Sequence, residues 1–232
     1  MHKYVMPQSV RDRVVARMGK PLAHETIEAG RAALVVVDMQ NYFCAEGFPA
    51  EVPLSREIVP AINRAAKAMR ASGGTVVWIQ TTAVGALERW ANFQTRMLTK
   101  ERQEKRVAGL DEASEGFKLF PALEVLPGDI RIKKVKYSAF IPDSSDIDAQ
   151  LKARGVDTVL ITGTLTNVCC ESTARDAMLL DYKVIMLSDG NATLSDEEHT
   201  GALNTFAMFF GDVMSTDEVI TRLLPVQQRK TA

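Results

Sequence analysis

Short runs of apolar residues recur along the chain and alternate with segments of helical periodicity. The runs that indicate strands are Ala32–Val37, Thr75–Ile79, Ile130–Val135, Thr158–Ile161 and Val184–Leu187. Strands that are apolar at successive positions, rather than at alternating ones, are buried on both faces, as in a parallel sheet. A shorter segment, Asp212–Ser215, predicts one more strand.

The segments between these runs carry apolar residues three or four positions apart. Helices are expected over residues 56–72, 145–154, the 170s and 195–209. Gly73 and Gly74 end the first of these, and Ser195 with Glu198 forms a capping-box pattern at the start of the last. The regular alternation of strand and helix predicts an α/β fold: a single-domain, doubly wound, mostly parallel sheet with helices on both faces.

Two segments depart from this alternation. Residues 1–30 are expected to form an N-terminal extension with a short helix, whose apolar side packs on the main domain, residues 31–232, or on a neighbouring subunit. The stretch around 82–128 is too long for a plain connection, so we expect an insertion that is partly helical and partly covers a site. Its charged run, Lys100–Arg106, is interpreted as a solvated helix face without a function.

Composition narrows the function classes. The chain has 232 residues, 46% hydrophobic and 25% charged, as in an average soluble globular protein. Its 28 Lys and Arg against 29 Asp and Glu leave a formal net charge of -1, which argues against nucleic acid as a partner. No apolar run is long enough to span a membrane, and the first residues lack the apolar core of a signal peptide, so we expect a cytoplasmic protein without a membrane partner.

Cysteine and histidine usage adds two exclusions. The three cysteines are Cys44, Cys169 and Cys170. Their odd number and the adjacent pair do not suit a disulfide framework. Cysteines and histidines also lack metal-ligand spacing, so we expect neither a metal site nor a cofactor.

Reactive side chains follow the carboxyl ends of three predicted strands, which is where ligands bind in open α/β sheets. They are Asp38 after the first strand, Lys133, Lys134 and Lys136 on or after the third, and Cys169 and Cys170 after the fourth. A thiol at a helix N-terminus has a lowered pKa and is the better nucleophile for it. A neighbouring carboxylate could take its proton while a lysine holds charge in place, and backbone N–H groups of the turn could stabilise an oxyanion.

Each of these residues also has a purely structural explanation. An Asp after a strand is often a turn or helix cap, a Lys near a strand end is usually solvated, and a buried Cys is more often a small apolar side chain than a nucleophile. Their joint occurrence at three strand ends of one sheet favours a cysteine hydrolase. Residue types and positions alone leave open which lysine and which of the adjacent cysteines would act.

Three stretches of the chain carry a family resemblance: Ala33–Asn41 (ALVVVDMQN), Lys134–Phe140 (KVKYSAF) and Gly163–Ala177 (GTLTNVCCESTARDA). They resemble the isochorismatase-like cysteine hydrolases, which include N-carbamoylsarcosine amidohydrolases, nicotinamidases and ureidoacrylate amidohydrolases. The resemblance implies a catalytic triad of Asp38, Lys134 and Cys169. It also implies a cis peptide between Thr164 and Leu165 and an oxyanion hole formed by the backbone N–H groups of Leu165 and Cys169.

The activity that the resemblance implies is hydrolysis of a small amide or ureido C–N bond through an acyl-enzyme on the cysteine, without a cofactor. The segment Asn41–Val52 lacks the histidines of nicotinamidase metal sites, and true isochorismatases lack the nucleophilic cysteine. Ureidoacrylate amidohydrolases are similar in the Tyr-Ser that follows Lys134, but Gln80–Ala83 replaces their aromatic Gln-Asn-Gly-Trp. The particular amide or ureido substrate is therefore left open.

Further expectations concern specificity and assembly. We expect Gln40, Trp90 and Tyr137 to contact the substrate, and His199 to be structural or interfacial. The family resemblance implies a homodimer or homotetramer. The alternative function is a catalytically silent or redox-sensing member of the same fold that acts as a binding protein, although a redox role would leave Asp38 and Lys134 without a task.

Overall fold

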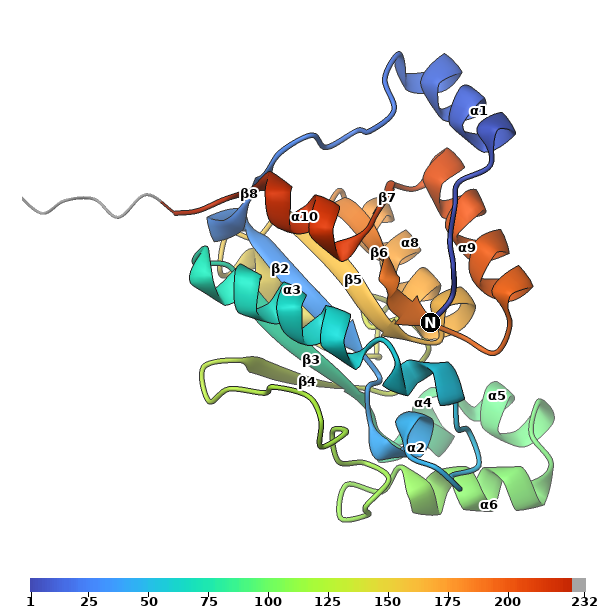
Figure 1. Cartoon of the computed structure of the whole chain (residues 1–232). Coiled ribbons are helices and arrows are strands. Elements are labelled where there is room, and N and C mark those ends of the chain that lie inside the picture. The colour runs from blue at the N-terminus through green and yellow to red at the C-terminus, as the bar shows by residue number, and fades with distance from the viewer. Residues whose placement is uncertain (227–232) are drawn as a thin grey trace, which may run out of the picture.

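A parallel sheet of six strands forms the centre of the protein (Figure 1). The structure, a computed structural model, describes residues 1–226. The strand order is β4-β3-β2-β5-β6-β7, and every neighbouring pair is parallel. The strands are β2 (Ala32–Val37), β3 (Thr75–Thr81), β4 (Ile130–Lys134), β5 (Thr158–Thr164), β6 (Lys183–Ala192) and β7 (Asp212–Met214). The predicted fold class is confirmed.

Helices connect these strands. They are α1 (Gln8–Met18), α2 (Asn41–Cys44), α3 (Val59–Ala71), α4 (Ala86–Arg89), α5 (Ala91–Arg96), α6 (Lys100–Gly109), α7 (Ile147–Lys152), α8 (Glu171–Leu179), α9 (Asp196–Phe209) and α10 (Thr216–Arg222). Three single turns, η1 (Ala29–Arg31), η2 (Pro53–Arg56) and η3 (Thr166–Cys170), and a small parallel pair, β1 (Ile27–Glu28) with β8 (Leu223–Leu224), complete the fold.

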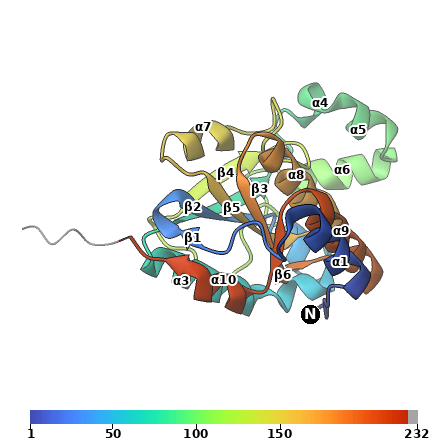
Figure 2. The ribbon, with the colours of Figure 1, turned by 90° about the horizontal axis from the view of Figure 1, so that it is seen from above.

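The sheet separates two apolar cores. Successive side chains of a strand point to opposite faces, so Val35 and Val37 of β2 lie in one core while Leu34 and Val36 lie in the other. The first core contains residues of α1, α7, α8 and α9, and the second contains residues of α3 and α10. Figure 2 shows α7 and α8 on one side of the sheet and α3 and α10 on the other. Each fully buried side chain of this size contributes about 1.5–3 kcal/mol.

Helix boundaries differ from the sequence prediction in two places. The helix predicted from residue 56 begins at Val59, with Pro60 in its first turn and the separate turn η2 before it. Proline has no N–H to donate and is favoured at the first positions of a helix, so regular helix starts there. The helix predicted over 145–154 is shorter, Ile147–Lys152, and Gly155 follows it at a positive φ of 69°.

The N-terminal segment packs along the main body. Val10 and Val14 of α1 are buried in the first core, and the helix lies against α9 (Figure 1). The helix begins at Gln8 after Pro7 and is followed by Gly19, whose φ of 74° is the left-handed conformation of a helix C-cap.

The insertion between β3 and β4 forms α4, α5, α6 and an irregular segment. Its helices lie beyond the carboxyl ends of β2 and β3 (Figure 1). The irregular segment then crosses the end of β2, where the Phe120 N–H donates to the Met39 carbonyl and Leu119 pairs with Gln40 as an isolated antiparallel bridge. The insertion therefore adjoins the edge of the sheet at which ligands bind in such folds.

The contact between β5 and β2 just before Asp38 depends on a residue without a side chain. Gly163 has a φ of 121°, and a Cβ there would overlap the carbonyl oxygen of Val37. We expect Gly163→Ala to lower the free energy of unfolding by about 3 kcal/mol or more, because both backbone conformation and spacing must change.

Denaturant unfolding measures this effect, with Gly201→Ala as the matched control. Gly201 lies inside α9 with open space around its Cα, so the same substitution there is expected to stabilise by up to about 1 kcal/mol. Equal unfolding midpoints for the two variants would contradict the packing described for Gly163.

Candidate active site

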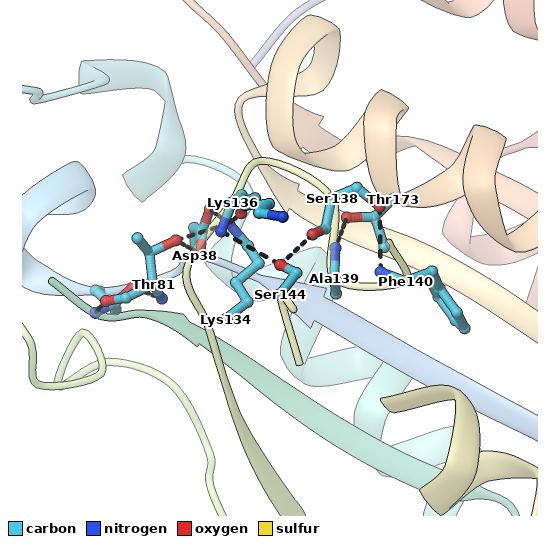
Figure 3. A network of polar contacts seen from close by, with 10 residues as sticks. Asp38, Thr81, Lys134, Lys136, Ser138, Ala139, Phe140, Ser144 and Thr173 are labelled. Atoms are coloured by element: carbon cyan, nitrogen blue, oxygen red, sulfur yellow. Dashed lines mark hydrogen bonds and ion pairs between the residues drawn. The ribbon is translucent and has the colours of Figure 1, made fainter. Parts of the chain in front are cut away.

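Three strands bring their last residues together at the carboxyl edge of the sheet. Asp38 directly follows β2, Thr81 ends β3, and Lys134 ends β4. Since β3 lies between β4 and β2, the side chain of Lys134 reaches across it to Asp38. Figure 3 shows the three side chains converging at this edge.

Asp38 and Lys134 form a buried ion pair. Lys134 Nζ lies 2.8 Å from Asp38 Oδ2, and both side chains are 1% exposed. Thr81 connects the pair a second time: its hydroxyl accepts from Lys134 Nζ at 2.7 Å and donates to Asp38 Oδ1 at 2.8 Å. Lys134 Nζ also donates to the carbonyl of Lys136 at 3.0 Å (Figure 3). Such polar satisfaction is what allows two charges to remain ionised away from water.

The electrostatics keep the lysine charged. Burial, the largest single influence, lowers the pKa of Lys134, but the charge of Asp38, the electrostatic influence of Cys169 and the hydrogen bond to Asp38 together outweigh it, and the net pKa is raised above the ordinary value. Asp38 Oδ2 lies 2.8 Å from Lys134 Nζ and has no further hydrogen-bond partner among the described residues. This oxygen can therefore accept a proton from a neighbouring group.

The backbone at Asp38 is held in an unusual conformation. Its φ is 54°, in the left-handed region that residues with a Cβ seldom occupy. The Asp38 N–H donates to the Ile79 carbonyl at 3.0 Å, which ties this conformation to β3. Strain of this kind persists where the surroundings fix it, and it concentrates at functional sites.

Cys169 lies in a wide helical turn between β5 and α8. In η3 the Cys170 N–H reaches back five residues to the Leu165 carbonyl at 3.1 Å, and α8 starts only at Glu171. The peptide bond between Thr164 and Leu165 is cis, as the resemblance implies. Cys169 is 4% exposed and its neighbour Cys170 is fully buried in the first core.

The prediction of a lowered thiol pKa is wrong. Burial raises the pKa of the Cys169 thiol to about 12, and the charge of Asp38 acts in the same direction, whereas the ammonium of Lys134 opposes both. Desolvation of the thiolate thus exceeds the favourable effect expected of a helix N-terminus. The resting site holds a neutral thiol beside an ion pair, and the structure brings together all three residues predicted as a triad.

Gln40 has a different role from the predicted substrate contact. Its side chain is fully buried, and its amide donates to the carbonyls of Thr81 and Phe117, both at 3.0 Å, and accepts from the Thr81 N–H at 2.7 Å. Because these backbone groups occupy the amide, the predicted substrate contact is corrected to a structural role. Gln40 joins the insertion to the end of β3.

Trp90 and Tyr137 do meet, together with a residue that the sequence prediction missed. The rings of Trp90 and Phe93 stack with centroids 4.0 Å apart, and Tyr137 lies edge-on to them at 4.7 and 5.3 Å. We call Trp90, Phe93 and Tyr137 the aromatic cluster. Phe93 follows Trp90 at helical spacing in the insertion, a signal that could have found it.

Arg106 is a second missed residue. The interpretation of Lys100–Arg106 as a solvated face holds for Lys100 and Lys105, which pair with glutamates on the surface of α6. Arg106 is half-buried, its Cζ lies 5.5 Å from the centroid of the Phe93 ring, and its charge lowers the pKa of Cys169. Charge runs give no information about which member turns inward, so the sequence pattern could not separate it.

Two stacked histidines support η3, the turn that bears Cys169, from the side of the N-terminal segment. The rings of His2 and His199 lie 4.4 Å apart, and His2 Nδ1 donates to Asp196 at 2.6 Å. His199 Nε2 donates to the Ser188 carbonyl at 3.1 Å, so its Nδ1 accepts from the hydroxyl of Thr166, the first residue of η3, at 2.9 Å. His199 thus has the structural position that was expected.

The described residues, 1–226, contain neither a group of metal ligands nor a membrane-spanning helix. Within that range, no three His, Cys, Asp or Glu side chains are grouped so that they could hold a metal ion. None of the helices described there has the length and apolar character needed to cross a membrane. The cytoplasmic location stays a prediction.

Comparison with known protein families identifies the family of this chain. The model described as the isochorismatase domain matches residues 32–218. The chain belongs to the isochorismatase family. Asp38, Lys134 and Cys169 all lie within the matched range, and the predicted family is confirmed.

Characterised relatives extend along most of the chain. Ureidoacrylate amidohydrolase RutB of Pseudomonas savastanoi pv. phaseolicola (strain 1448A / Race 6) is 31% identical, with 96% of this chain and 95% of that protein covered. The protein of the same name from Pseudomonas syringae pv. syringae (strain B728a) is 33% identical, with 87% of each covered. The prediction of a C–N hydrolase is confirmed at the level of enzyme class.

Solved structures with a similar fold include a cysteine hydrolase and an amidase. A cysteine hydrolase from Pseudomonas syringae pv. phaseolicola 1448A superposes with a TM-score of 0.77 at 34% identity, covering 88% of this chain and 98% of that chain. N-carbamoylsarcosine amidase from Thermoplasma acidophilum superposes with a TM-score of 0.63 at 23% identity, covering 81% and 97%, and shows likeness of fold alone.

The buried His199 predicts a pH-dependent loss of stability. Burial, reinforced by the charge of His2, lowers its pKa from 6.5 to about 4. Between these values the unfolded chain binds a proton that the folded protein does not, so stability is full above pH 6.5 and falls as the pH drops towards 4, by at most about 3 kcal/mol.

His199→Gln should lack this component. Unfolding free energies of wild type and variant, measured from pH 7.5 to pH 4.5, are expected to converge as the pH falls, because only the wild type loses the histidine contribution. Parallel curves over that range would show that His199 is not held neutral by the fold.

Proposed function

We propose that the chain hydrolyses a small amide or ureido C–N bond through an acyl-enzyme on Cys169, with Asp38 and Lys134 completing the triad. The observation that carries this proposal is the buried ion pair of Asp38 and Lys134 at the turn that bears Cys169. Relatives named as amidohydrolases over most of the chain support the type of bond.

The first step forms the covalent bond. The thiol of Cys169 is neutral at rest, so its proton passes to Asp38 as Sγ attacks the carbonyl carbon of the substrate. Lys134 stabilises the Asp38 carboxylate before the transfer and holds its orientation at 2.8 Å. The backbone N–H groups of Leu165 and Cys169 are proposed to bind the oxyanion of the tetrahedral intermediate.

Collapse of that intermediate breaks the C–N bond. Asp38 returns its proton to the departing nitrogen, which leaves as ammonia or an amine, and the acyl group remains on Cys169 as a thioester. Water then attacks the thioester while Asp38 takes a proton from it, and the acid product and the free thiol are released. Each proton that Asp38 accepts is delivered again, so the cycle is closed without a cofactor.

The segment after β3 differs in sequence from the motif of ureidoacrylate amidohydrolases. Gln80 donates to the Phe117 carbonyl at 2.8 Å, Thr81 binds Asp38, and Thr82 donates to Glu112 at 3.1 Å. The segment Gln80–Ala83 thus holds the insertion and the triad, where ureidoacrylate amidohydrolases carry an aromatic motif. Ureidoacrylate is the first compound to test and not the only one.

The alternative of a silent or redox-sensing binding protein is less well supported. A redox sensor exposes a thiolate of low pKa, whereas burial raises the pKa of both Cys169 and Cys170. A silent member would have no use for an ion pair that costs desolvation. The expected homodimer or homotetramer stays a prediction.

Ammonia release tests the nucleophile. We expect wild type to turn over at least one of N-carbamoylsarcosine, ureidoacrylate, biuret, nicotinamide and maleamate. Cys169→Ala should lower kcat/KM by at least about 10³-fold, because the covalent route is lost. The matched control, Cys170→Ala, removes a neighbouring buried thiol and should stay within about tenfold of wild type. Loss of activity in Cys170→Ala with activity retained in Cys169→Ala would refute the assignment.

A further inference from the structure

A cation without a counter-ion stands at the aromatic cluster. Arg106 is half-buried on the last turn of α6, with its Cζ 5.5 Å from the centroid of the Phe93 ring. Lys100 and Lys105 of the same helix pair with Glu104 and Glu101, and Arg102, which has no ion pair among residues 1–226, is exposed to solvent, so Arg106 differs from Arg102 in being half-buried. The side chain of Arg106 has no ion pair or hydrogen bond with any residue in 1–226.

The contact with Phe93 involves the face of the Arg106 guanidinium but not its hydrogen-bond donors. A cation–π contact satisfies the face of the guanidinium and is worth about 0.5–2 kcal/mol. The N–H groups of the guanidinium, which project in its plane, remain available. A half-buried Arg with free donors in a fixed fork is suited to a carboxylate, which it binds with two parallel hydrogen bonds.

The position of Arg106 relates it to the proposed nucleophile. Phe93 stacks on Trp90 and meets Tyr137, and Tyr137 comes three residues after Lys134 of the ion pair. Burial raises the pKa of both Tyr137 and Cys169, and the positive charge of Arg106 is one of the smaller influences that oppose this rise in each. The cation–π contact with Phe93 therefore places the guanidinium at the aromatic cluster, and Tyr137 connects this cluster to the segment that follows Lys134.

We propose that Arg106 binds a carboxylate of the substrate, so that the enzyme acts on acids that carry an amide or ureido group rather than on neutral amides. This inference rests on the proposed function. The substrate would lie with its scissile carbonyl at Cys169, its short carbon chain against the aromatic cluster and its acid group at Arg106. Arg106 is then a specificity-determining residue supplied by the insertion.

A purely electrostatic role makes a different prediction. If Arg106 acted only by lowering the pKa of the Cys169 thiol, its removal would slow neutral and acidic substrates alike. If it binds a carboxylate, its removal raises KM for the acid and leaves a neutral analogue unaffected. Comparing an acid with its uncharged ester therefore separates the two roles.

The kinetic test uses ureidoacrylate and its methyl ester with wild type, Arg106→Gln and Arg102→Gln. Arg102 lies one turn earlier on α6, is exposed and carries the same charge, which makes it the matched control. In Arg106→Gln we expect KM for the acid to rise about 10- to 100-fold, as for a lost charge-assisted hydrogen bond, with less than about threefold change for the ester. Arg102→Gln should change neither by more than about threefold.

A binding measurement distinguishes failure of the proposed carboxylate site from failure of the proposed hydrolase function. Calorimetry with Cys169→Ala, and with the same protein carrying Arg106→Gln, measures the affinity for ureidoacrylate without turnover. If Cys169→Ala binds the acid more tightly than the ester, and adding Arg106→Gln abolishes this preference, the carboxylate site is supported. That conclusion holds even if wild type shows no turnover, a result that would overturn the proposed function alone. Turnover of acid and ester with equal kcat/KM, or equal loss of both in Arg106→Gln, would overturn the carboxylate site alone. No binding and no turnover would overturn both.

Discussion

The ion pair between Asp38 and Lys134 determines how the rest of the site is built. Two opposite charges that are 1% exposed are stable only when further polar groups satisfy them, and the hydroxyl of Thr81 and the carbonyl of Lys136 do so. Loss of either charge would leave the other buried and unpaired, at a cost of about 3–5 kcal/mol. The arrangement requires three adjacent strand ends at one edge, which the order β4-β3-β2 supplies.

The fold places the neutral thiol of Cys169 against this pair. The thiol of Cys169 keeps its proton because burial disfavours the thiolate, and Asp38 Oδ2 is available to receive it. The proposed reaction therefore starts from a carboxylate held beside an ammonium group, and not from a thiol of low pKa. The stacked pair of His2 and His199 supports the same turn through Thr166, so the N-terminal segment also contributes to its position.

The sequence predicted the sheet and its parallel strands through local runs of apolar residues, and it placed reactive side chains at the strand ends, whereas only the family resemblance selected Lys134 and Cys169 among them. It missed what depends on tertiary contact. The amide of Gln40 is occupied by backbone groups from distant segments, and Arg106 differs from its charged neighbours only in the direction it faces. The pKa of Cys169 was expected to fall because helix dipoles can be anticipated from sequence, whereas complete burial of a thiol cannot.

The central claim is a covalent acyl group on Cys169, formed with Asp38 as the base. The most direct test is rapid acid quenching of the enzyme during turnover of a ureido or amide substrate, followed by mass spectrometry of its peptides. The account predicts an added acyl mass on Cys169 in wild type that appears at early times, decays as substrate is exhausted, and is absent in Asp38→Asn. Turnover with the Cys169 peptide unmodified at every quench time, or with the added mass on Cys170, would contradict it.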